Sequence, residues 1–291
     1  MRQIALLNRV FVLAFFFGVS NPVSGHAQDV LEDAVQHPDD QAIVDRYIGT
    51  LPEIPPGSDH FMVEGDLYLD RSSIVAYLKS RNAAEPLPTG ELIVDTKDGQ
   101  PDYLKSIASR QLTYSVVASS FPSVKLAERT DKELQQAAKD WIDACPDCRI
   151  SLTEVPIEKA GKFYEKVTFV LTYLDVSSGP IARSFFPSSS PDDRQIVIFP
   201  DFFASDLQFD RTGVLRHEFG HIIGYRHEQL NALSGCNTSE PANWKPLTPY
   251  NPHSVMHYMC GKGGSFALEL SGSDIKGHRC LYLTGSRCAE K

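Results

Sequence analysis

The feature that most constrains this chain is the stretch at residues 217–228, which reads HEFGHIIGYRHE. Residues four apart lie on the same face of a helix, so His217 and His221 can direct both imidazoles at one metal ion. Gly224 permits the positive φ that ends a helix and turns the chain, so His227 can reach the same metal from another direction. The stretch therefore predicts a helix, a tight turn and a metal site with three histidine ligands.

Glu218 adds the chemistry that this stretch predicts. It lies one step round the helix, close enough to touch a metal-bound water but badly placed to act as a ligand, which suits a general base. Three histidine nitrogens leave a fourth position open, as in catalytic zinc sites, whereas structural zinc sites usually have four protein ligands and are rich in Cys. The alternative is a buried amphipathic helix with incidental histidines.

The long pattern H-E-x-x-H-x-x-G-x-x-H resembles the signature of the metzincin zinc peptidases, in which a methionine turn follows. Ser254-Val255-Met256-His257-Tyr258 is similar to this Met-turn in the astacin branch, where Met256 would lie beneath the metal and Tyr258 could reach it. Glu228, directly after the third histidine, also resembles astacins. The resemblance implies an α+β metzincin-type catalytic domain with a twisted, mostly parallel sheet, an active-site helix and a small C-terminal subdomain below the cleft.

The resemblance also implies a mechanism and a function. One Zn²⁺ per chain, bound by His217, His221 and His227, would activate a water whose proton Glu218 accepts, and this water would attack a peptide bond. Tyr258 is the candidate for stabilising the oxyanion. We therefore expect an exported zinc-dependent endopeptidase acting on protein or peptide substrates. The alternative is a catalytically silent, metzincin-like secreted binding module, and the intact Glu218 argues against it.

The start of the chain predicts a signal peptide at residues 1–27. Arg2 and Arg9 precede the apolar run 10–19, and small residues then lead to a cleavage site after Ala27. No later stretch approaches the roughly 20 apolar residues that a membrane crossing needs. The formal net charge of -9 argues against binding to nucleic acid or to an anionic membrane surface. We expect a secreted or periplasmic monomer.

The rest of the chain divides by composition into an N-terminal pro-region, residues 28–110, and a catalytic domain, residues 111–291. The pro-region lacks Cys and is interrupted by proline-bearing breaks, with helical patterns near 30–48 and 72–80. Between those patterns, residues 61–69 resemble the Phe-x-Gly-Asp stretch of astacin propeptides, whose Asp binds the zinc. Asp66 is thus a candidate latency ligand. The alternative is an ordinary Gly-Asp turn.

Hydrophobic patterns in the catalytic domain predict an alternation of strands and helices. Residues 181–187 are similar to a matrixin segment that forms the upper rim of the cleft, an edge strand that can pair with extended substrate or can be an ordinary strand. The other expected elements are strands at 112–117, 149–155, 166–174 and 195–199, and helices from Thr130 or Asp131 to Ala144, from 211 to 224, and from Ser271 onward. The apolar side of the first of these helices would consist of Leu134, Ala137, Ala138 and Trp141, and the pattern Ser271-x-x-Asp274 can cap the last one.

Six cysteines follow the signal peptide, which indicates disulfides in an oxidising compartment. Cys145-Pro146-Asp147-Cys148 could be a redox motif or half of a zinc site, but it lacks a βαβ context and a second C-x-x-C. We expect a local disulfide there. Pairing each remaining cysteine with its bracketing mate predicts Cys236–Cys260 and Cys280–Cys288, although six cysteines permit 15 connectivities.

Overall fold

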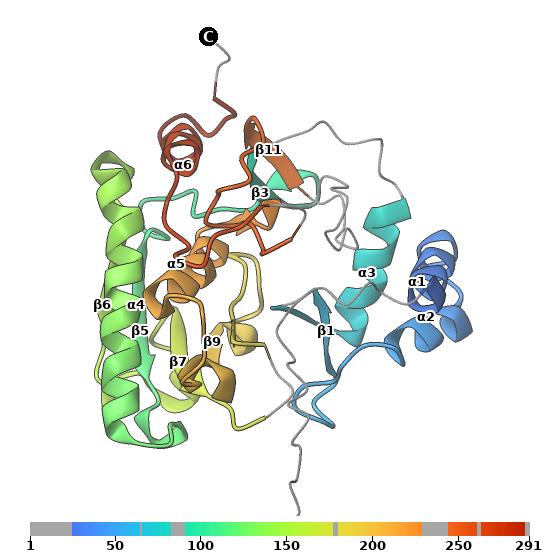
Figure 1. Ribbon diagram of the computed structural model, residues 1–291, viewed down its shortest axis with the longest axis horizontal. Helices are drawn as coiled ribbons and strands as arrows, with labels where there is room; N and C mark the ends of the chain where they lie inside the picture. Colours follow the sequence, from blue (N-terminus) through green and yellow to red (C-terminus); the bar gives the residue numbers. More distant parts are fainter. Residues whose placement is uncertain are drawn as a thin grey trace, which may run out of the picture.

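The computed structural model describes residues 25–64, 66–82, 91–176, 180–228, 244–260 and 263–288 (Figure 1). Its main sheet has five strands in the order β6-β5-β7-β9-β8. The first four strands of this order run parallel, and β8 is the antiparallel edge strand paired with β9. The predicted α+β class with a mostly parallel sheet is confirmed. The strands are β5 (Gln111–Val116), β6 (Ser151–Glu154), β7 (Phe169–Tyr173), β8 (Ala182–Arg183) and β9 (Gln195–Ile198).

Two helices, α4 (Val124–Ala144) and α5 (Arg211–Ile222), pack against each other beside this sheet. The indole N–H of Trp141 on α4 donates to the carbonyl of Arg216 on α5 at 2.9 Å, and Asp140 pairs with the Arg216 guanidinium. These contacts matter for function because α5 carries two of the predicted metal ligands. The packing of the two helices therefore fixes the backbone positions of these two ligands.

The predicted start of α4 at Thr130 or Asp131 is wrong. The helix begins at Val124 because the Ser123 side chain accepts a hydrogen bond from the backbone N–H of Leu126, as an N-cap residue does. The Thr130 hydroxyl instead donates to the Leu126 carbonyl inside the helix. The predicted apolar side of α4 is confirmed, because its members are all buried: Leu134, Ala137, Ala138 and Trp141.

A second, antiparallel sheet lies next to the end of α5. Its central strand β3 (Glu91–Lys97) has β10 (Tyr225–Arg226) on one side and β11 (Trp244–Thr248) on the other, with β4 (Gln100–Pro101) as a hairpin partner. Helix α6 (Gly272–Thr284) packs against β3 and β11. It begins with a capping box between Ser271 and Asp274, as the sequence predicts.

The N-terminal residues form a body with its own apolar core, which we call the N-terminal module (residues 25–82). In Figure 1 its helices lie on the opposite side of the molecule from α4, with α5 and β1 between them. The prediction of a pro-region and that of a signal peptide stay predictions, and residues 1–24 lie outside the described part of the chain. The module consists of α1 (Gly25–Gln36), α2 (Gln41–Ile48), β1 (His60–Glu64), β2 (Leu67–Asp70) and α3 (Arg71–Asn82).

Short 3-10 helices connect many of the longer elements. They are η1 (Ala118–Ser120), η2 (Pro146–Cys148), η3 (Ile157–Lys159), η4 (Lys162–Tyr164), η5 (Pro191–Asp193) and η6 (Pro200–Phe203). Among the helices that the structure describes, none has the length and apolar character needed to cross a membrane.

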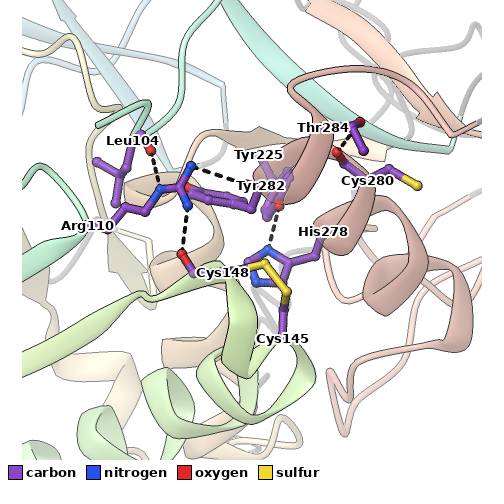
Figure 2. The surroundings of a disulfide bond; sticks show 9 residues. All are labelled: Leu104, Arg110, Cys145, Cys148, Tyr225, His278, Cys280, Tyr282 and Thr284. Atoms are coloured by element: carbon purple, nitrogen blue, oxygen red, sulfur yellow. Dashed lines mark hydrogen bonds between the residues drawn. A yellow bond between two sulfur atoms is a disulfide. The ribbon is translucent and has the colours of Figure 1, made fainter. Parts of the chain in front are cut away.

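Two of the three predicted disulfides are present. Cys145 is bonded to Cys148 at the end of α4, and Cys280 on α6 is bonded to Cys288. Cys260 is disulfide-bonded as well, but its predicted partner Cys236 lies outside the described residues. Figure 2 shows the Cys145–Cys148 bond beside the ring of His278, which comes from α6. The bridge thus lies where α4 and α6 meet.

Candidate metal centre

Three histidine side chains converge at the C-terminal end of α5. The Nε2 atom of His227 lies 3.1 Å from that of His217 and 3.1 Å from that of His221. All three residues are buried. The structure therefore brings together the three ligands that the sequence predicts, two from α5 and one directly after the short strand β10.

The hydrogen bonds of the Nδ1 atoms of His217 and His221 show which ring nitrogen is available to bind a metal. His217 Nδ1 lies 2.8 Å from the carbonyl oxygen of Val255, and His221 Nδ1 lies 2.7 Å from that of Tyr225. A carbonyl only accepts, so each Nδ1 carries the proton and each Nε2 presents a lone pair, as in metal-bound histidines. Lone pairs this close repel each other unless a cation lies between them.

The spacing of these nitrogens fits a small tetrahedral ion. Bonds of about 2.0–2.1 Å to zinc place two nitrogens of a tetrahedron roughly 3.3 Å apart. The observed separations of 3.1 Å are close to that value. Three neutral imidazoles together with a carboxylate are also a donor set that zinc accepts. The site therefore fits a metal ion, and the geometry does not by itself identify which one.

Two glycines allow the backbone to approach this closely. A Cβ atom on Gly220 would lie 2.5 Å from Sδ of Met256, so the glycine lets this buried methionine pack directly beneath α5. Gly224 has a φ of +105°, and a Cβ there would meet the Asp102 carbonyl oxygen at 2.3 Å. The first contact places residues 254–258 under the site, and the second turns the chain back toward His227.

Asp274 of α6 holds the turn at residues 254–258 in place. Its carboxylate accepts from the hydroxyl of Ser254 at 2.6 Å and from the backbone N–H of Val255 at 3.0 Å. The carbonyl of Val255 in turn receives the proton of His217. The sequence predicts Asp274 only as part of the start of a helix. Its contact with residues 254–258 was not predicted, because a capping pattern does not indicate which segment packs against the end of the helix.

Asp66, from the turn between β1 and β2, reaches the centre of the three imidazoles. Its Oδ1 lies 3.1 Å from Nε2 of His227, and its Oδ2 lies 3.2 Å from that of His217 and 3.7 Å from that of His221. Burial alone would raise the pKa of Asp66, but electrostatic attraction to the neighbouring imidazoles, His227 foremost, holds it well below its usual range. The carboxylate is therefore ionised beside the metal ligands.

Glu218 lies in the same buried region but belongs to a different face of α5. Burial raises the pKa of its carboxyl well above the usual range, and the nearby charge of Asp66 raises it further. His227 and Arg183, the latter on edge strand β8, oppose that rise. A buried carboxyl with a raised pKa beside a group of metal ligands is a candidate to accept and return a proton.

Tyr258 packs against the ligand rings from the side of residues 254–258. Its ring centroid lies 4.2 Å from that of His227 and 5.8 Å from that of His217. Phe186, in the segment predicted as a cleft rim, contacts His221 edge-on at 5.4 Å. The candidate residues named from the sequence thus gather at one place, whereas the chemical roles assigned to them stay predictions.

Comparison with known proteins adds no relative to this picture. No family model matches the chain, and no curated protein matches it. The function is therefore inferred from the arrangement of the site itself.

Proposed function

We propose that this chain is an exported zinc-dependent endopeptidase of the metzincin type. The observation that carries the proposal is the convergence of three histidine Nε2 atoms with a buried glutamate beside them. His217, His221 and His227 would hold one Zn²⁺, which supplies a positive charge that favours ionisation of an attacking water and polarises a carbonyl. Met256 forms the floor of the site beneath α5.

The protein's own groups then carry the proton transfers. Glu218 accepts a proton from the attacking water as a C–O bond forms at the scissile carbonyl. It returns this proton to the departing amine as the C–N bond breaks, so the glutamate is restored at the end of each cycle. The hydroxyl of Tyr258 donates a hydrogen bond to the oxyanion, which develops only in the transition state. Edge strand β8 offers backbone groups for pairing with an extended peptide.

In this proposal Asp66 keeps the uncut chain inactive. Its carboxylate lies within reach of all three ligand nitrogens and so occupies the position that water and substrate would need. Carboxylates are good zinc ligands, and tethering raises the effective concentration of this one. Release of the N-terminal module would withdraw Asp66 and open the site. A catalytically silent binding module would show the same geometry without turnover.

The substitution Glu218→Gln tests the proposal. It leaves the ligand face intact, so zinc content should stay unchanged, while hydrolysis of a protein substrate should fall about 10²- to 10⁴-fold with loss of the general base. Glu269→Gln, on the exposed surface, is the matched control. Equal turnover by both variants and the parent would contradict the mechanism. Absence of turnover from the processed parent would favour the silent binding module.

A further inference from the structure

The turn at residues 224–227 does two things for the metal centre. The carbonyl of Tyr225 accepts the Nδ1 proton of His221, and the chain two residues later delivers His227 as the third ligand. A small shift of this turn would therefore rotate one ligand and displace another. The groups that hold it in place act on the metal site without touching the metal.

Asp95 on β3 holds this turn at both ends. Its backbone N–H donates to the carbonyl of Gly224 at 2.8 Å. Its carboxylate accepts from Nη1 of Arg226 at 3.1 Å, and both side chains are buried. The carbonyl of Tyr225, which orients His221, lies between these two points of attachment.

Arg226 is held from its other side by an aromatic ring. Its guanidinium carbon lies 5.5 Å from the centroid of Phe186, a distance at which cation–π attraction operates. The same Phe186 ring packs edge-on against His221. The guanidinium thus lies between the β3 carboxylate and a ring that contacts a metal ligand, and its planar shape suits both contacts.

Stability alone does not account for a charged pair at this position. A buried ion pair gives little or no net stability compared with apolar residues of similar volume, because both charges lose their hydration. An ion pair does impose a direction and a distance, which apolar packing does not. Groups in this second layer around a metal typically change metal affinity or activity when they are replaced.

We propose that Asp95 and Arg226 form a positioning pair that fixes the 224–227 turn and thereby sets the affinity of the three-histidine site for its metal. This inference depends on the metal site proposed above. It also assigns β3 to the metal-binding unit, so that residues 91–110 stay with that unit when the N-terminal module is released. The division between the two parts then lies before Glu91 and not at residue 110.

Zinc affinity of the full chain, measured by competition with a chromophoric chelator, tests the pair. The double variant Asp95→Leu/Arg226→Met replaces both members of the pair with apolar side chains, so neither is buried without the other and folding should be preserved. We expect its zinc affinity to fall about 10- to 100-fold, with an unchanged unfolding midpoint for the metal-free protein. Asp98→Asn, at the exposed turn after β3, is the matched control and should bind zinc like the parent.

A second variant covers the case in which the double variant does not fold. Arg226→Lys keeps the charge but loses the planar fork, and it should weaken zinc binding in the same direction with a folded chain. Parental zinc affinity in every folded variant would overturn the positioning pair while leaving the metal site standing. Failure of the parent to bind zinc would overturn the proposed function instead. An active processed form whose N-terminus lies after Asp95 would contradict the assignment of β3, provided that the cut strand has dissociated.

Discussion

Two segments precede the main sheet in the sequence, and they relate to it in opposite ways. The N-terminal module has its own apolar core. Its described contacts with the rest of the protein include a small cluster of Ile54 with Val197 and Phe199, the His60–Asp193 pair and Asp66. Most of its buried apolar side chains pack against one another within the module. A separate core of this kind is what release of the module, as proposed above, would require.

The segment at residues 91–110 has no core of its own. Leu92, Val94 and Leu104 belong to the main apolar cluster of the protein. The buried guanidinium of Arg110 donates to the carbonyls of Leu104, Cys148 and Tyr282 (Figure 2). The contrast teaches that a boundary drawn from cysteine and proline content does not show which residues share a core.

The largest expected effect tests whether the groups needed for peptide hydrolysis all lie in the part of the chain that remains after the N-terminal module is released. In the processed enzyme, Tyr258→Phe should lower kcat on the order of 10²-fold, because a donor to the oxyanion acts mainly in the transition state. KM should change little. Steady-state kinetics on a peptide substrate measure both constants. A change in KM alone would make Tyr258 a pocket wall.

The next effect tests whether the module silences the site through one carboxylate. A tethered ligand acts at an effective concentration of about millimolar, so Asp66→Ala in the uncut chain should raise hydrolysis of a small peptide about tenfold or more. Asp29→Ala, on an exposed position of the module, is the control that also removes one negative charge. If the uncut Asp66→Ala chain is as inactive as its parent, the N-terminal module blocks the site by covering it and not through the Asp66 carboxylate.

Acid should destabilise the larger of the two parts, because His278 is buried in it. Burial lowers the pKa of His278 to about 3, so the folded protein keeps this imidazole neutral. The unfolded chain binds a proton below its ordinary pKa of about 6.5. The protonation of His278 in the unfolded chain should therefore lower the free energy of unfolding by about 1.4 kcal/mol for each pH unit as the pH drops from 6.5 toward 3.

Urea unfolding of the metal-free protein between pH 6.5 and pH 5 measures this slope. The variant His278→Gln should show a slope smaller by about one proton. His278 belongs to the larger part, so this slope reports on the unfolding of that part. Equal slopes for parent and variant would show that His278 does not contribute to acid sensitivity.

The smallest effect concerns the polar contact across the junction of the two parts. His60 Nε2 lies 3.1 Å from Oδ1 of Asp193, and both side chains are about one-third exposed. Partly exposed pairs of this kind contribute about 0–1 kcal/mol. The uncut variant His60→Ala should therefore stay nearly as inactive as its parent in the peptide assay. An increase in peptide hydrolysis as large as that caused by Asp66→Ala would mean that contacts at the interface, and not the Asp66 carboxylate at the zinc site, keep the uncut chain inactive.

Local patterns in the sequence predict the parts of the site that lie on one element or in one turn. The spacing of His217 and His221 predicts a shared helical face, and Gly224 predicts the turn toward His227, because both follow from backbone geometry alone. The mostly parallel sheet was predicted through the resemblance to a known family, and its strands lie within a few residues of their expected positions.

The contacts that the sequence does not predict join distant segments. Strand β3 pairs with β10, which has only two residues, and with β11, which contains a proline, so neither partner has a strand pattern. The Asp98-Gly99 turn after β3 was a hairpin signal that could have been used. The pairing of Asp95 with Arg226 depends on that sheet and could not be inferred before it.

The metal content of the full chain tests the central claim most directly. After dialysis against metal-free buffer, inductively coupled plasma mass spectrometry should find one zinc per chain in the parent, since three neutral imidazoles and the Asp66 carboxylate converge on one point. His227→Ala should lose most of this zinc, whereas His253→Ala, on an exposed position, should retain it. A folded parent that takes up no zinc, or a His227→Ala variant that keeps it, would contradict the account.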